Sequence, residues 1–74
     1  MREDPVLKKL VYVLGADEAP RFISSTCRDL GLKGLDAPQE RMVFACNLIE
    51  RGGLMEAIGR AIKIQAILHG AREP

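Results

Sequence analysis

The chain has 74 residues, of which 47% are hydrophobic and 28% are charged, and its formal net charge is +1. This length allows one domain with a small core, and the composition excludes the low-hydrophobicity, high-charge class of disordered chains. No run of like charge is longer than two residues, as at Lys8-Lys9, which excludes the basic footprint of a nucleic-acid-binding protein. We therefore expect residues 1–74 to form a single globular domain.

The sequence carries no signal for membrane insertion or export. No uncharged stretch approaches the roughly 20 apolar residues that span a bilayer. The first residues, Met1–Pro5, lack the apolar core of a signal peptide. We expect a soluble, cytoplasmic protein without a membrane partner.

Helical periodicity begins close to the N-terminus. A first helix is predicted from Pro5 to Leu14, with Asp4 as its cap and proline at the first helical position. Gly15 is expected to end it. Its apolar stripe consists of Leu7, Leu10, Val11 and Leu14.

A second helix is predicted from a cap at Asp17 to about Leu30. Pro20 is tolerated in its first turn because the N–H groups there have no partner inside the helix. The predicted buried face consists of Ala19, Phe22, Ile23, Cys27 and Leu30, and the outer face of Arg21, Ser24, Ser25, Arg28 and Asp29. Residues 31–35 then predict a loop, with room for a short helical turn, because they combine two glycines with two leucines that can plug the core.

A third helix is predicted from the segment that follows this loop up to Arg51. Asp36 is expected to cap it, with Pro38 in the first turn and Gln39 in the capping-box position. Its core stripe consists of Met42, Ala45, Cys46 and Ile49, with Phe44 beside a polar face of Glu40, Asn47 and Arg51. Cys27 and Cys46 both fall on apolar stripes, so both are predicted to be buried thiols.

A fourth helix is predicted from Leu54 to about His69, after a tight reversal at Gly52-Gly53. Its polar face is predicted to hold Glu56, Gly59, Arg60 and Lys63, which leaves an apolar arc wider than one packing face needs. We favour a helix that the other three enclose. The alternative is a helix that a second chain partly covers.

The C-terminal end is expected to carry no chemistry. His69 suits the end of a helix, where a cationic side chain complements the helix dipole. Residues 70–74 are predicted to be a frayed tail or the stub of a linker. The predicted core of the domain is therefore residues 5–69.

Motifs with catalytic or metal-binding chemistry are missing from the sequence. One histidine at the end of a helix is a poor basis for acid–base or nucleophilic catalysis, and there is no phosphate-binding glycine motif, HExxH or CxxC. We expect a non-enzymatic protein without cofactor or metal. A helix-turn-helix formed by the second and third helices is disfavoured, because the connection is long and the third helix offers only Arg41 and Arg51 as bases.

Two pieces of sequence carry a resemblance to a known family. Residues 22–32 read hydrophobic-x-x-x-x-Cys-x-Asp-Leu-Gly-Leu. Residues 45–58 combine a helix, an Arg-Gly-x-Leu turn and a following helix with Glu56 in its first turn. With this order, Val6 to Ile62 resembles the effector-associated domains of bacterial conflict systems, which are similar to animal death-fold modules such as the caspase recruitment domain. Gly53 departs from the family, which often has arginine at that position.

This resemblance implies a six-helix or reduced five-helix bundle. Together with the four helices that periodicity predicts, we expect an all-α, compact antiparallel bundle of four to six helices, death-fold-like in arrangement. The resemblance also implies an adaptor or recruitment domain of antiphage defence, which joins a sensor to an effector such as a protease by pairing with a similar domain. Assemblies of this kind are often open-ended, with one face of a subunit on a different face of the next. The residues of this chain expected to make the contacts are charged and of both signs: Arg28, Asp29, Glu50, Arg51, Glu56 and Arg60.

Two alternatives to the adaptor remain at the level of sequence. One is a homodimer in which Phe44 and the broad apolar arc of the fourth helix meet across a two-fold axis. The other, less favoured, is a small helix-turn-helix protein that binds DNA. An apolar dimer should be insensitive to salt, whereas docking through charges should weaken as salt rises.

Overall fold

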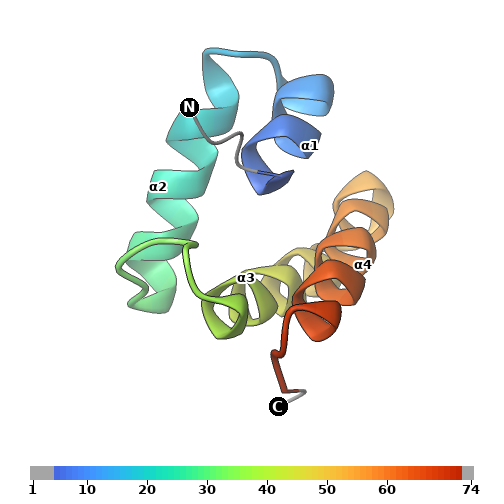
Figure 1. Ribbon diagram of the computed structural model, residues 1–74. Coiled ribbons are helices and arrows are strands. Elements are labelled where there is room, and N and C mark those ends of the chain that lie inside the picture. Colours follow the sequence, from blue (N-terminus) through green and yellow to red (C-terminus); the bar gives the residue numbers. More distant parts are fainter. Residues whose placement is uncertain (1–4, 73–74) are drawn as a thin grey trace.

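Four helices make up the fold in the computed structural model, which describes residues 5–72 (Figure 1). Their bounds are α1 Pro5–Leu14, α2 Glu18–Leu30, α3 Pro38–Arg51 and α4 Gly53–Leu68. All elements of this described part are helical, which confirms the all-α class. Residues 31–37 form bends rather than a further helical turn, so the helix number stands at the lower end of the expected range.

The ends of the first two helices follow the sequence closely. α1 ends at Leu14 as predicted, while its expected cap, Asp4, lies outside the described residues. Asp17 occupies the position before α2, but its side chain makes no capping hydrogen bond. At the other end of α2, Gly31 has φ of 71°, and the N–H of Leu32 donates to the Cys27 carbonyl at 2.8 Å. This is a Schellman ending, which glycine adopts without steric cost.

The start of α3 differs from the prediction by one residue. Ala37, not Asp36, is the capping residue, and Glu40, not Gln39, occupies the third helical position. A Glu40 carboxylate oxygen accepts the N–H of Ala37 at 3.0 Å. This is one half of a capping box, since an alanine side chain cannot accept the reciprocal bond.

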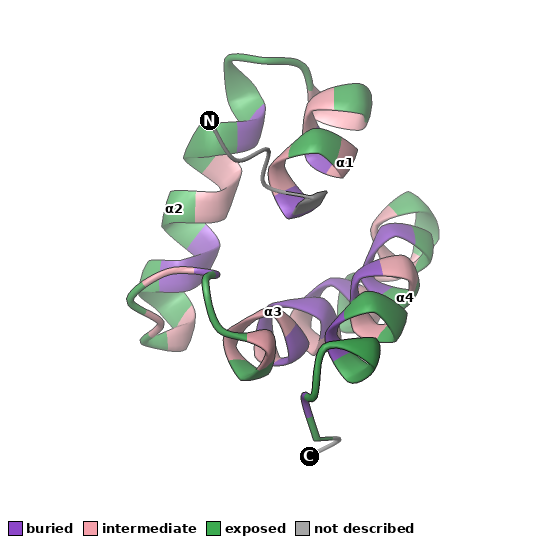
Figure 2. Ribbon diagram, in the orientation of Figure 1, coloured by how far each residue is buried: buried purple, intermediate pink, exposed green. Residues whose placement is uncertain are grey.

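The core lies where all four helices meet (Figure 2). Buried side chains come from each helix and from the loop, where Leu35 plugs the core as expected. The largest side chains with almost no exposed surface are Phe44, Leu10, Met42, Leu48, Ile62 and Val6. Phe44, which the alternative homodimer would bring to a two-fold interface, is instead 0% exposed and meets Phe22 edge to face, with ring centroids 6.3 Å apart, so this part of the alternative was wrong.

Close contact between α3 and α4 depends on a glycine. Gly59 was predicted on the polar face of α4, but it is buried against α3. A Cβ atom at this position would lie 2.8 Å from the Ala45 carbonyl oxygen and 2.9 Å from the backbone nitrogen of Ile49. The side of α4 that packs on α3 therefore includes a position that residue polarity assigned to the exposed face.

α4 is covered on one side only. It packs chiefly on α3 and makes a smaller contact with α1, so the other three helices do not enclose it. Figure 1 shows α4 at one edge of the molecule, across from α2. Gln65 is accordingly exposed.

The segment after α4 is held against α3, contrary to the predicted frayed tail. The amide side chain of Gln39 accepts the N–H of Arg72 at 2.9 Å and donates to the Arg72 carbonyl at 3.1 Å. Ala71 is buried in a small second cluster with Met42 and Ala66. This correction covers residues 70–72, and residues 73 and 74 lie outside the described part.

The two thiols differ in environment. Cys27 is buried in the core, as predicted, whereas Cys46 is half-buried beside the second cluster. They form no disulfide with each other. Among residues 5–72, no helix combines the length and apolar character that crossing a bilayer requires.

Candidate interaction surface

The six charged residues predicted to make contacts lie on different sides of the molecule. Arg28 and Asp29 are exposed on α2, Glu50 and Arg51 are exposed at the end of α3, and Glu56 and Arg60 lie on the first half of α4. Because α2 and α4 stand on opposite sides in Figure 1, the six residues do not form one patch.

The outer face of α2 forms a shallow, open hollow. Its lining consists of Pro20, Arg21, Ser24, Ser25 and Arg28. Two arginines and no acidic residue make this surface weakly basic. Asp29, the next residue along the helix, points about 100° away from Arg28 around the helix axis.

The corner between α3 and α4 is neutral and internally bonded. Arg51 donates from Nε to the Asn47 side-chain oxygen at 2.8 Å, and its guanidinium lies 4.9 Å from the centre of the Phe22 ring. Arg60 donates to one carboxylate oxygen of Glu56 from Nη2 at 2.7 Å and from Nε at 3.1 Å. These arginines already have partners within the chain, so the corner offers few unsatisfied charges for docking.

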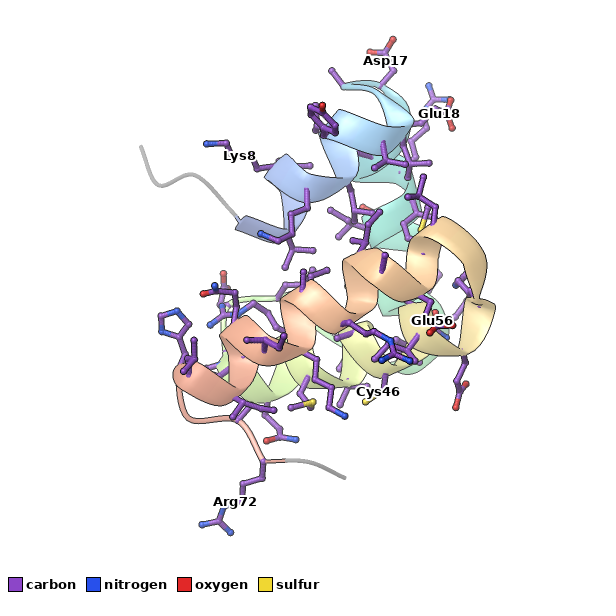
Figure 3. All side chains as sticks on the ribbon, turned by 90° about the vertical axis from the view of Figure 1, so that its right-hand side faces the viewer. Lys8, Asp17, Glu18, Cys46, Glu56 and Arg72 are labelled. Carbon is purple, nitrogen blue, oxygen red and sulfur yellow. The ribbon has the colours of Figure 1, made fainter. Side chains whose placement is uncertain are left out.

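An exposed apolar face runs along α4. Leu54, Ile64 and Leu68 are 61%, 59% and 73% exposed, and Ile67 is 42% exposed. Isolated exposed leucines are ordinary, but several on one side of one helix are not. Figure 3 looks onto α4 from outside and shows no other helix in front of it.

The residues of this face recur at regular spacing. The α4 seam, as we call it, consists of Leu54, Ala57, Ala61, Ile64 and Leu68, which follow one another at intervals of three, four, three and four residues. This interval is the one by which two helices pack against each other along their length. Ala57 is exposed and Ala61 half-buried, so the seam is continuous on the surface.

Charges border the seam on one side. Arg60 is three residues after Ala57 and four before Ile64, so it neighbours both on the helix surface. Its ion-pair partner Glu56 lies one turn earlier. Two of the six predicted contact residues therefore flank the apolar face. The sequence alone indicated this face only as part of a wide apolar arc on the fourth helix.

Within residues 5–72, no three His, Cys, Asp or Glu side chains gather into a metal-binding group.

Comparison with known protein families, with curated proteins and with solved structures found no match to this chain.

Proposed function

We propose that the chain is a protein–protein interaction module, an adaptor or recruitment domain that works by pairing with a like domain. The observation that carries this proposal is the α4 seam, an apolar face of three largely exposed aliphatic side chains on a rigid helix. Such a face is stabilised when a partner covers it, because burying a Leu or Ile side chain contributes about 1.5–3 kcal/mol.

The resemblance to death-fold modules gives this proposal its finer form. In that form the domain joins a sensor to an effector such as a protease in bacterial antiphage defence, and like domains pair. Sequence features that support it are the cysteine-containing end of the second helix and the glycine turn before the fourth. An enzymatic role finds no support in the motifs of the sequence.

Self-association of the isolated chain tests the proposal. Light scattering after size exclusion, from about 10 µM to about 1 mM protein, should report a mass that rises with concentration. A constant monomer mass over this range would contradict homotypic pairing.

Two modes of association can then be separated by charge reversal. The variant Arg28→Glu reverses one of the predicted contacts that lie away from the α4 seam, and it leaves the acidic contacts unchanged, so no opposite-charge pair is restored. Docking through opposite charges predicts that this variant loses association and that high salt has the same effect. Docking through the seam predicts that the variant behaves as the parent does, with unchanged helicity in both cases.

A further inference from the structure

Residues 70–72, which we call the C-terminal strap, turn back after α4 and lie against α3. The N–H of Ala71 donates to the Ala66 carbonyl at 2.9 Å, which is the long bond of a Schellman ending. The Gln39 side chain then accepts the N–H of Arg72 and donates to its carbonyl. The strap is therefore fixed at two points, one on α4 and one at the start of α3.

The strap covers an apolar cluster that is separate from the main core. Ala71 is 9% exposed and joins Met42 and Ala66, both 0% exposed, in this second cluster. None of the three belongs to the cluster where the four helices meet. Because the two groups of buried residues are distinct, one can lose its cover while the other stays packed.

The contacts that hold the strap on α3 are few. Both hydrogen bonds between Gln39 and Arg72 are exposed to solvent, so water can replace them at a small net cost. The apolar contribution of the strap is the single methyl group of Ala71, a small area. Gly70, with φ of 106°, links the strap to α4, and glycine can take up other backbone conformations cheaply.

We propose that the C-terminal strap is a lid, which opens and closes over the second cluster while the four-helix core stays folded. Opening breaks the two bonds to Gln39, swings residues 71–72 about Gly70 and exposes Met42 and Ala66. Contacts this few place the open form at about 0.1–10% of molecules. The chain thus gains an apolar surface on α3 that only the open form presents. This inference does not depend on the α4 seam or on the proposed function.

Native-state thiol labelling, followed by mass spectrometry, tests the lid. Ala71→Cys in a Cys46→Ala background places a thiol under the closed strap, and the buried Cys27 is the reference thiol in the same molecule. We expect the thiol at position 71 to be labelled at least tenfold faster than Cys27. Its rate should change little with urea below the unfolding transition, because opening exposes little surface, whereas the rate at Cys27 should rise steeply.

Two results of this labelling would overturn the lid. Equal rates with the same urea dependence at both thiols mean that the strap opens only when the whole domain unfolds. A rate at position 71 equal to that of an unstructured peptide means that the strap does not close. If the substitution itself holds the strap open, hydrogen exchange of the Arg72 amide in the unmodified chain gives the same comparison, against amides in the middle of α3.

A matched pair of variants separates the lid from the fold. Ile58→Val removes a methylene group from the main core and should raise the labelling rate of Cys27 by about 2- to 12-fold, without changing the rate at position 71. Gln39→Ala removes the bonds to the strap and should raise the rate at position 71 by about 2- to 12-fold. Equal acceleration of both thiols by Ile58→Val contradicts a lid that opens by itself.

Discussion

Gly59 is the residue on which the α3–α4 contact depends most directly. Replacing it with alanine would place a methyl group 2.8 Å from the Ala45 carbonyl oxygen and 2.9 Å from Leu48 Cβ, where ordinary contacts are 3.4–4 Å. Backbone atoms cannot move aside singly, so the two helices must separate. Overpacking costs about 1–3 kcal/mol, and the upper part of this range, about 2–3 kcal/mol, applies here because backbone must shift. Alanine's better helix propensity returns only about 1 kcal/mol.

Urea unfolding, monitored by circular dichroism, measures the net change in unfolding free energy. For a small domain whose slope is about 1 kcal/mol per molar urea, we expect the Gly59→Ala midpoint to fall by about 1–2 M. The matched control is Gly34→Ala, because its new methyl would meet no atom closer than 3.9 Å. This control should gain about 0.4–1 kcal/mol from a less flexible unfolded chain. A Gly59→Ala midpoint at or above that of the parent would refute the close packing described for these helices.

Three further predictions concern contacts away from the seam. Gln39→Ala removes both hydrogen bonds to the Arg72 backbone and should lower the unfolding free energy by about 0.5–1.5 kcal/mol. The backbone amide of Arg72 should exchange its hydrogen faster, and an unchanged exchange rate would contradict these bonds. Cys46 should react with a thiol reagent in the native state while Cys27 reacts only on unfolding, and equal rates would be inconsistent with their burial. Arg51→Ala removes the cation–π contact with the Phe22 ring and should lower the unfolding free energy, measured in a thermal melt, by about 0.5–1 kcal/mol.

Helix positions were well determined by local signals. The bounds of α1 match because proline and glycine act on the backbone at its two ends, whatever the helix packs against. The ending of α2 was equally local, since a left-handed residue at Gly31 needs only the carbonyls of the preceding turn. At α3 two neighbouring residues, Asp36 and Ala37, could have been the cap. The outcome depended on which side chain, Gln39 or Glu40, could reach back to the backbone, and spacing alone did not resolve it.

Packing between helices was harder to predict, because the polarity of a small residue, or of a residue beside a polar face, does not show whether its side of the helix faces the core. Gly59 has no side chain, so a helical wheel assigns it to the face of its charged neighbours, although its value to the fold is the close approach of α3. Phe44 shows the same difficulty. It adjoins a polar face on its own helix, yet it is interior because Phe22 of α2 packs against it. Both depend on a neighbouring element that no local pattern specifies.

The candidate site was predicted in part. Glu56 and Arg60 were chosen for their charge, and they border the apolar face that the structure leaves uncovered. The seam itself was present in the sequence as a three-four-three-four spacing, but an amphipathic helix that faces a core shows similar spacing. Only the position of α4 at the edge of the molecule distinguishes the covered side from the open one.

The proposed function depends on pairing of the chain with itself through the apolar face of α4. Sedimentation equilibrium of the unmodified chain at low and high salt tests it most directly. We predict a monomer–dimer equilibrium whose dissociation constant changes little with salt, because apolar burial is not screened and the rim charges contribute about 1 kcal/mol or less. Large species that high salt dissolves, or a monomer at every concentration, would contradict this account.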